Sequence, residues 1–239
     1  MATTYESAAF WRPPGGRQPH ARRRTRCPVR LRDLGVMEYG ECLRLQHGLR
    51  DERQRSQGED TILMVEHPPV ATLGRRGTPE EVFDATLPVH VVERGGKATY
   101  HGPGQLVLYP IVHLGEGNRD VRAWVRHLEA LLVRCLADFG VAAHAKPDLP
   151  GVWTAATDRK VASIGIAIQH WVSFHGVALN VTVDPREFER IDPCGLGAAV
   201  MTSMQREGSG ATMAEVKAWM HRNAAEHISA FRVERNLSQ

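Results

Sequence analysis

The sequence lacks long apolar runs and paired cysteines, and each absence excludes a class of protein. The apolar stretch LVLYPIVHL ends after nine residues, whereas a membrane-spanning helix needs about 20. The four cysteines, Cys27, Cys42, Cys135 and Cys194, form no C-x-x-C pair, so neither a zinc ribbon nor a thioredoxin-type site is indicated. We expect a cytoplasmic location, in which cysteines without paired spacing are free thiols. We also expect no secretory signal, because no apolar segment follows the first arginines.

Two kinds of cofactor site are also missing. The stretch GGKAT looks superficially like a phosphate-binding loop, but the spacing G-x-x-x-x-G-K-[ST] is absent, so nucleotide binding is not indicated. His101, His144 and His175 have no metal-ligand spacing, and no predicted helix would set one. We therefore expect neither a metal nor another cofactor.

Charge is divided unevenly along the chain. Residues 1–32 carry eight arginines and one acid, a net charge of +7, whereas the rest of the chain carries −4. The first segment is rich in proline and glycine and too poor in apolar residues to fold alone. We predict a mobile arm over residues 1–32 and one catalytic domain over residues 33–239. A nucleic-acid-binding or targeting arm is an alternative, although the body offers no net positive field to attract nucleic acid.

Apolar periodicity predicts runs of strands with a few helices between them. Helical patterns cover residues 35–56, 120–139 and 212–231, and the last opens on Thr212 and Glu215, which fit a capping box. Strand patterns, which end in a β-meander of hairpins, cover residues 61–73, 89–96, 104–114 and 151–183. Such grouping favours an α+β fold with a mixed, largely antiparallel sheet flanked by helices.

The cysteines differ in their local patterns. Cys135 falls on the apolar stripe of its helix and Cys42 lies in another helical segment, so both are interpreted as small core residues. Cys194, in IDPCGLGAAVMTS, follows a proline and precedes a glycine, with no helix or strand period. It is either an incidental loop cysteine or a thiol presented to a cleft as a nucleophile.

Two other polar residues lie on apolar strand faces. Lys160 begins KVASIGIAI and shares a face with Ile164 and Ile166. Its ammonium either reaches solvent from the strand end or is partly desolvated, which lowers its pKa and makes it a usable base. His175 shares a face with Val177 and is either a hydrogen-bonded core histidine or a site group.

The stretch ERGGKATYHGPGQLVLYP, residues 93–110, is the most unusual segment. It places four glycines around Arg94, Lys97 and His101. Glycine costs conformational entropy on folding, so several in one loop indicate that backbone approaches another group closely. A tight turn alone would not explain the basic residues that gather there.

Together these motifs resemble one known family. RGGKATYHGPGQLVLYP is similar to the signature of bacterial octanoyltransferases, also called lipoyl(octanoyl) transferases. The match continues through EHPPVATLGRRG, GVW, KVASIGIAI, FHGVALNV and FERIDPCGL, in the family's order, and covers roughly residues 33–210. The resemblance implies the catalytic fold of biotin and lipoate protein ligases. It also implies transfer of an octanoyl or lipoyl group from acyl carrier protein to a lysine of a lipoyl-accepting domain.

The resemblance also implies roles for particular residues. Cys194 would carry the acyl group as a thioester, and Lys160 would pair with it and manage protons. Three segments would line the acyl pocket: Arg94, Gly95, Gly96, Lys97, Ala98, Thr99, Tyr100 and His101; Ser163, Ile164 and Gly165; and His175, Gly176 and Val177. Val177 stands where the family commonly has leucine. Backbone N–H groups of the glycine loop would face the thioester oxygen, and His101 would polarise that carbonyl or orient Lys160.

The implied partners are octanoyl-acyl carrier protein, the lipoyl-accepting domains of 2-oxoacid dehydrogenases and the glycine cleavage H protein. We expect the protein itself to be a monomer. Because such partners are usually acidic, docking should need a local basic rim, for which Arg75, Arg76, Lys97 and Arg159 are candidates. Three alternatives remain open. An ATP-dependent lipoate or biotin ligase would need ATP and tolerate loss of Cys194. A non-catalytic binding module would form no acyl adduct. A nucleic-acid binder would stop binding nucleic acid when residues 1–32 are deleted.

Overall fold

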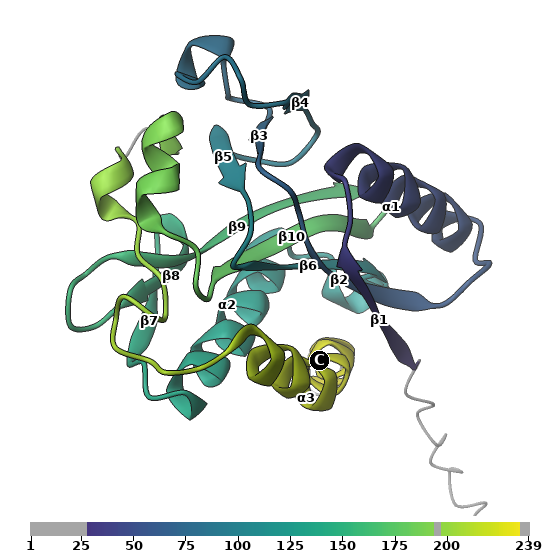
Figure 1. Cartoon of the computed structure of the whole chain (residues 1–239). Helices are drawn as coiled ribbons and strands as arrows, with labels where there is room; N and C mark the ends of the chain where they lie inside the picture. Colours follow the sequence, from purple (N-terminus) through teal and green to yellow (C-terminus); the bar gives the residue numbers. More distant parts are fainter. Residues whose placement is uncertain (1–27, 194–196, 235–239) are drawn as a thin grey trace, which may run out of the picture.

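The strands of the protein form two sheets. The computed structural model describes residues 28–193 and 197–234 (Figure 1). The larger sheet has the strand order β1-β2-β6-β10-β9-β8-β7 and the smaller one β4-β3-β5. Among the described strands, β1 with β2 and β3 with β4 pair parallel, and the other named pairs are antiparallel. The mixed, largely antiparallel sheet predicted from the sequence is confirmed. The strands are β1 (Val29–Val36), β2 (Asp60–Glu66), β3 (Val70–Leu73), β4 (Val89–Val91), β5 (Ala98–His101), β6 (Gln105–His113), β7 (Ala143–Lys146), β8 (Leu149–Thr154), β9 (Lys160–Gln169) and β10 (Val172–Asn180).

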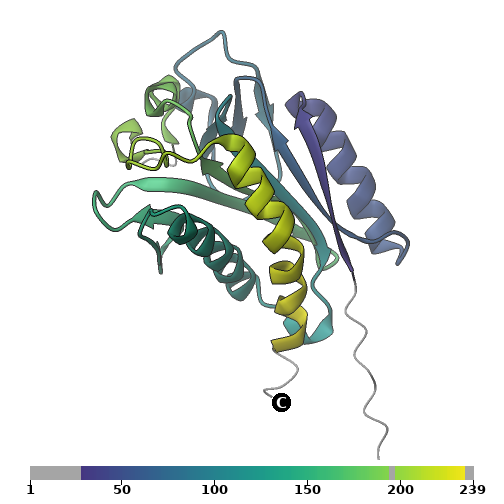
Figure 2. The ribbon, with the colours of Figure 1, turned by 60° about the horizontal axis from the view of Figure 1, so that its bottom comes forward.

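Helices cover both faces of the larger sheet. The helices α2 (Val121–Asp138) and α3 (Met213–Glu234) lie side by side on one face, and α1 (Tyr39–Gln54) lies on the other (Figures 1 and 2). The main core packs α2 and α3 against the sheet, and a second apolar cluster lies under α1. Buried on both faces, β6 and β10 read in the sequence as nearly continuous apolar runs.

The helix ends follow the capping signals of the sequence. The side chain of Asp120 accepts a hydrogen bond from the backbone N–H of Ala123 and so caps α2. At α3, Thr212 Oγ1 accepts from the N–H of Glu215, while Glu215 Oε2 accepts from the N–H of Thr212. This is the predicted capping box.

The meander β8-β9-β10 is confirmed, but three strands were not predicted. β1 begins at Val29, so the expected boundary of the arm at residue 32 falls inside a strand; residues 1–27 lie outside the described part of the chain. β7 adds an edge strand beside β8. β5 occupies part of the glycine-rich segment that the sequence suggested was a loop.

The smaller sheet holds the glycine-rich segment above the larger one. Its strands β3 and β5 pack with Phe188, in the 3₁₀ helix Pro185–Arg190, in a third apolar cluster. The N–H of Gly95 donates to the carbonyl oxygen of Ile166 on β9, at 3.0 Å. Residues 94–101 are therefore fixed against the larger sheet, where β9 and β10 run beneath them.

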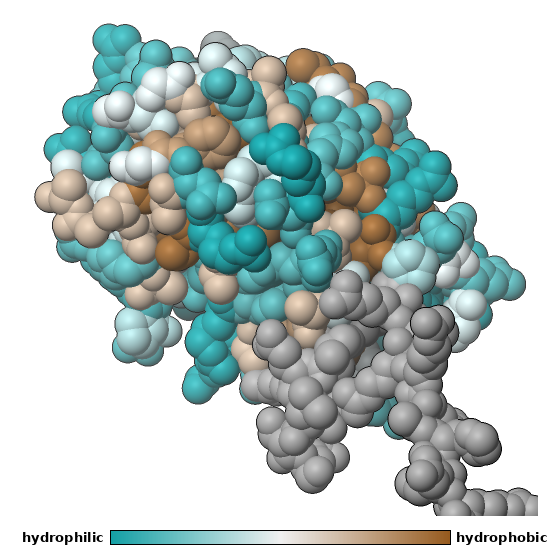
Figure 3. Space-filling model, turned by 90° about the horizontal axis from the view of Figure 1, so that it is seen from below, coloured by the Kyte–Doolittle hydropathy of each residue, from teal (hydrophilic) through white to brown (hydrophobic). Residues whose placement is uncertain are grey.

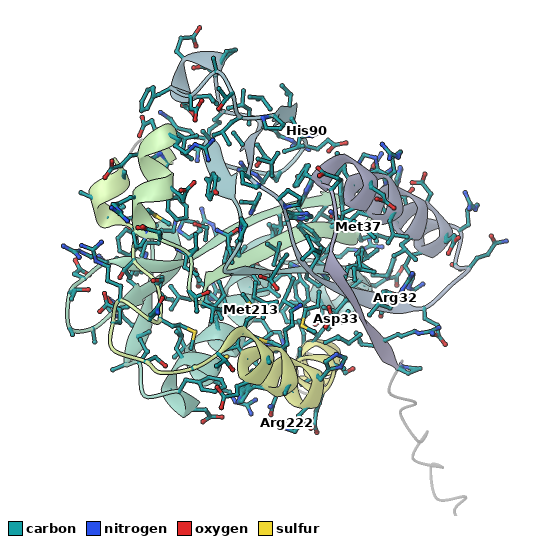
Figure 4. The ribbon with its side chains drawn as sticks, in the orientation of Figure 1. Arg32, Asp33, Met37, His90, Met213 and Arg222 are labelled. Carbon is teal, nitrogen blue, oxygen red and sulfur yellow. The ribbon has the colours of Figure 1, made fainter. Side chains whose placement is uncertain are left out.

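The first strand lies between two helices. Asp33 on β1 lies on the side of α3, and Met37 lies beside α1 (Figure 4). Lys217 of α3 contacts both Asp33, at 3.6 Å, and Glu66 of β2, at 3.3 Å. These ion pairs fasten the last helix to the edge of the sheet.

One face of the molecular surface mixes polar and apolar side chains. On the face seen in Figure 3, hydrophobic side chains form separate patches among hydrophilic ones. Within the part of the chain that the structure describes, no helix combines the length and the apolar character that crossing a bilayer requires.

Candidate active site

A central pocket opens where the glycine-rich segment crosses β9 and β10. Its cavity volume is about 50 Å³, it is open to solvent on one side, and most of its wall is apolar. All the predicted lining residues contribute except Lys97, Ala98 and Tyr100. The wall consists of Tyr39, Arg94, Gly95, Gly96, Thr99, His101, Val107, Tyr109, Lys160, Ser163, Ile164, Gly165, His175, Gly176, Val177 and Ala178.

The alternation of β5 explains two of the three exceptions. Thr99 and His101 point into the central pocket, whereas Ala98 and Tyr100 point the opposite way, into the third apolar cluster. Lys97 instead contacts Glu81, with Nζ 3.2 Å from Oε1. The prediction treated residues 94–101 as a continuous lining loop and therefore missed this division between two faces.

Arg94 organises the loop by binding backbone and hydroxyl oxygens. Its guanidinium donates to the carbonyl oxygen of Thr72 at 2.7 Å, to Thr72 Oγ1 at 2.8 Å and to the carbonyl oxygen of Gly95 at 3.0 Å. The side chain crosses β9 at Gly165, where an added Cβ would lie 2.9 Å from Arg94 Cδ. The glycine at 165 is therefore required by a close approach.

Lys160 is buried at the end of the central pocket. It is 5% exposed, and its Nζ lies over the ring of Trp153, 5.8 Å from the ring centroid. Between β8 and β9 the register shifts, as at a β-bulge, from Val152↔Ala162 to Trp153↔Lys160. Bulges re-aim side chains, and here the lysine lies inside the wall of the pocket. Of the two interpretations from the sequence, desolvation fits this position and a solvent-reaching lysine does not.

Cys194 lies outside the described residues, together with Gly195 and Leu196. The chain on either side of them is anchored. Before them, the N–H of Asp192 donates to the carbonyl oxygen of Glu81 at 2.7 Å; after them, the N–H of Thr202 donates to the carbonyl oxygen of Lys160 at 3.0 Å. The chain that follows these residues is thus hydrogen-bonded, at Thr202, to the strand that carries the lysine.

A buried hydrogen-bond chain fixes the tautomer of His101. The carbonyl oxygen of Thr202 can only accept, and it accepts from Asn180 Nδ2 at 2.8 Å. Asn180 Oδ1 then accepts from Gln105 Nε2 at 3.0 Å, which leaves Gln105 Oε1 as the acceptor 2.6 Å from His101 Nδ1. His101 therefore carries its proton on Nδ1.

The state of His101 limits what it can do. Burial lowers the pKa of His101 to about 3, so the ring is neutral at pH 7 and its Nε2 is a hydrogen-bond acceptor. A neutral ring in this tautomer cannot donate to a carbonyl oxygen from Nε2. The suggestion that His101 polarises the substrate carbonyl is therefore not supported, whereas a role in accepting a proton or orienting an amine is compatible with the geometry.

His175 proves to be both a core residue and a wall of the pocket. It is 1% exposed, and burial lowers its pKa to about 4. Its Nε2 lies 3.3 Å from Glu93 Oε2, and its backbone N–H donates to Gln46 Oε1 at 3.0 Å. A buried, hydrogen-bonded histidine and a pocket-lining histidine are therefore the same residue here.

Aromatic residues outside the sequence motifs complete the wall. Tyr39 at the start of α1 stacks on His101, with ring centroids 5.9 Å apart and planes 11° from parallel. The hydroxyl oxygen of Tyr109 lies 2.9 Å from His67 Nε2. The sequence prediction missed both tyrosines, because only the packing of α1 and β6 around the pocket brings them there.

The other thiols that the structure describes are inert. Cys42 and Cys135 are both fully buried and free, and burial raises the pKa of each to about 12. Their interpretation as core residues is confirmed. Among the described side chains, no group of three histidine, cysteine, aspartate or glutamate residues is arranged to hold a metal ion.

Comparison with known proteins identifies the family. Residues 38–224 match the lipoyl protein ligase A/B catalytic domain. The chain is 45% identical over 191 residues to the octanoyltransferase of Syntrophotalea carbinolica, covering 80% of this chain and 90% of that protein. The chain belongs to the octanoyltransferase family. A member from Geotalea uraniireducens is 43% identical, covering 78% of this chain and 86% of the relative, and a probable octanoyltransferase from Pyrobaculum aerophilum is 44% identical, covering 77% and 80%.

Solved structures show the same fold at low sequence identity. The bipartite lipoate protein ligase of Thermoplasma acidophilum aligns with a TM-score of 0.67 at 16% identity, over 84% of each chain. A lipoate-protein ligase A bound with ATP aligns with a TM-score of 0.64 at 15% identity, over 84% of this chain and 85% of the other. The ligase-like fold expected for an octanoyltransferase is thereby confirmed.

Proposed function

We propose that this octanoyltransferase moves an octanoyl group from acyl carrier protein to a lysine of a lipoyl-accepting domain through a thioester on Cys194. The observation that carries the proposal is the position of Lys160. It is a buried amine in the wall of an apolar pocket, on the strand to which the segment after Cys194 is hydrogen-bonded. Family membership supplies the acyl group and the reaction type.

The first half-reaction loads the enzyme. The Cys194 thiolate attacks the thioester carbonyl of octanoyl-acyl carrier protein, the carrier thiolate leaves, and it takes up the proton given up by Cys194. An ammonium at Lys160 favours the thiolate, and the neutral amine can accept the thiol proton. The acyl group stays activated because one thioester replaces another, so no ATP is required.

The second half-reaction transfers the octanoyl group from the enzyme to the acceptor. The neutral amine of the acceptor lysine attacks the thioester carbonyl of the acyl-enzyme, an amide forms, and the Cys194 sulfur leaves. Lys160 takes the proton that the attacking nitrogen loses and passes it to the departing sulfur, which restores the thiol. The Nε2 of His101, an acceptor on the same wall, can hold an N–H of the incoming amine while it attacks.

The central pocket suits a hydrocarbon chain. Ile164, Val177 and Ala178 present apolar surface, and each methylene buried there contributes about 0.8 kcal/mol to binding. The N–H of Gly95 is not available to the thioester oxygen, because it donates to Ile166. Of the loop glycines, Gly102 and Gly104 are required by close approaches away from β9, since an added Cβ would collide with the Tyr100 side chain at Gly102 and lie 2.5 Å from the backbone N of Val183 at Gly104.

The proposal includes the partners and the setting. The donor is octanoyl-acyl carrier protein, and the acceptors are lipoyl-accepting domains of 2-oxoacid dehydrogenases and the glycine cleavage H protein, met by a monomer in the cytoplasm. The free buried thiols Cys42 and Cys135 support a reducing setting.

A mass measurement tests the proposal. Incubation with octanoyl-acyl carrier protein should raise the mass of the protein by one octanoyl group, and hydroxylamine should remove it. The adduct should be absent from the Cys194→Ala variant and unchanged in Cys135→Ala. An adduct that survives in Cys194→Ala, or transfer that needs octanoate and ATP instead of the carrier, would reject the thioester route.

A further inference from the structure

We propose that Glu129 is a positioning residue for Lys160, which it holds in place through the backbone of Gly151 and through its own charge. The inference rests on the proposed function, since it gives the reason why a lysine can stay at a fixed place in an apolar wall. Glu129 belongs to α2, which packs on β8, and it does not line the central pocket.

Glu129 is an unexpected residue where it lies. It is 4% exposed, on the face of α2 that carries Leu128, Leu132 and other core residues. A buried carboxylate is costly unless it has partners. Its Oε1 accepts a hydrogen bond from the backbone N–H of Gly151 at 3.1 Å. The helix thus holds the peptide at Gly151 with an ionisable side chain where leucine would be the simpler core residue.

Lys160 lies against the same glycine. An added Cβ at Gly151 would be 2.5 Å from Lys160 Cε and 3.3 Å from Lys160 Nζ. Gly151 also has φ +130°, which other residues rarely adopt. The aliphatic part of the lysine side chain therefore rests on the backbone that Glu129 holds, and moving that backbone would move the amine.

Charge connects the two residues as well. Burial raises the pKa of Glu129, while the Gly151 N–H, Arg126 and Lys160 act in the opposite direction and favour the carboxylate. The interaction is reciprocal, so the carboxylate favours the ammonium form of Lys160. Among the described residues, the other charged groups near Glu129 are Arg122 and Arg126 on α2, Asp148, and Lys146, whose Nζ lies 4.0 Å from the Trp153 ring centroid; Cys194 lies outside the described residues.

The sequence makes a direct test practical. It contains four lysines, Lys97, Lys146, Lys160 and Lys217, so the Cε signals of a ¹³C-lysine-labelled protein can be assigned by substitution. The titration is done in the Cys194→Ala background, where the thiol of that residue contributes nothing. The Glu129→Gln variant keeps an oxygen acceptor for Gly151 and removes the charge.

We expect Glu129→Gln to lower the titration midpoint of Lys160 by about one pH unit and to leave the midpoint of Lys217 unchanged. Asp148→Asn, which removes an exposed carboxylate near the same end of α2, should leave Lys160 unchanged. A folded Glu129→Gln protein with the parental Lys160 midpoint would overturn the proposal. This readout needs no catalysis, so it can fail or succeed independently of the thioester mechanism.

Kinetics give a second readout in the Cys194 protein. Glu129→Gln should reduce kcat for octanoyl transfer about tenfold, with KM for the carrier unchanged, and should move the alkaline limb of the pH profile to lower pH. Glu129→Ala should reduce kcat further, because the N–H of Gly151 then loses its hydrogen-bond acceptor as well. Equal and wild-type kcat values in both folded variants would show that the carboxylate is only a packing residue.

Discussion

Lys160 lies over the ring of Trp153, with Nζ 5.8 Å from the ring centroid, while Lys146 approaches the same ring to 4.0 Å. The two lysines share an aromatic neighbour but differ in surroundings. Lys160 lines the central pocket and is buried, whereas Lys146 forms an ion pair with Asp158 at 2.7 Å. This pair of sites offers a matched test of the catalytic role of Lys160.

Lys160→Met should keep the packing on Trp153 and remove the amine. We expect octanoyl transfer to fall by at least ~100-fold, the scale of a lost proton-transfer group. Lys146→Met should retain nearly full activity, with circular dichroism confirming that both proteins fold. Transfer by Lys160→Met at a near-wild-type rate would exclude the amine from the reaction.

The sequence predicted the elements, and most of the residues that line the central pocket, better than it predicted which face of a strand each residue occupies. Hydrophobic periodicity located α2 and the meander, and the spacing of Thr212 and Glu215 located the capping box of α3, because each signal is local. It missed β1 and β5, whose pairing with β2 and β3 is decided by contacts distant in the sequence. Tyr39 and Glu129 were missed for a similar reason: each acts on a strand that only the tertiary fold brings near.

Gly165→Ala should displace the loop that covers the pocket. The added Cβ would lie 2.9 Å from Arg94 Cδ and 3.4 Å from the carbonyl oxygen of Gly95, so the loop must shift away from β9. We expect KM for octanoyl-acyl carrier protein to rise several-fold. The control is Gly48→Ala in α1, where nothing lies within 4 Å of the new Cβ and stability should rise by up to ~1 kcal/mol. Equal kinetics for the two variants would contradict the assigned loop contact.

Arg75 and Arg76 should contribute to docking of acidic partners. Both are exposed, and their backbone N–H groups donate to the carbonyl oxygens of Arg94 and Gly96, which places them beside the pocket loop. The double variant Arg75→Glu with Arg76→Glu should raise KM for octanoyl-acyl carrier protein and reduce its salt dependence.

Transfer from a small octanoyl thioester, which has no protein surface to dock, should be unaffected by the same change. Arg222→Glu serves as the control, because it makes the same kind of charge reversal on the exposed side of α3, away from the smaller sheet (Figure 4). If Arg222→Glu weakened carrier binding as much, general charge and not the local rim would be responsible.

Buried histidines should make the protein less stable in acid. Burial lowers the pKa of His67 and His175 to about 4 and that of His101 to about 3, from an ordinary value of 6.5. The unfolded chain therefore binds more protons below pH 6.5. Stability is fully present above that pH and is lost as the pH falls toward 3, by about 1.4 kcal/mol per pH unit for each histidine.

Thermal unfolding between pH 7 and pH 4 measures this slope. His101→Asn, which can still donate to Gln105, should reduce the dependence of the unfolding free energy on pH by the contribution of one histidine. An unchanged slope would mean that His101 is not held neutral in the folded protein.

Cysteine labelling should separate the reactive thiol from the core thiols. With a pKa of about 12, Cys42 and Cys135 are almost entirely protonated at pH 7.5 and are inaccessible, so iodoacetamide should modify neither until the protein is unfolded. Cys194 should react in the folded protein, and prior incubation with octanoyl-acyl carrier protein should protect it in proportion to the adduct measured by mass. Rapid native labelling of Cys135 would contradict the buried position assigned to it. Undiminished labelling of Cys194 in a protein that carries the octanoyl group would place the acyl group on another atom and require a different nucleophile.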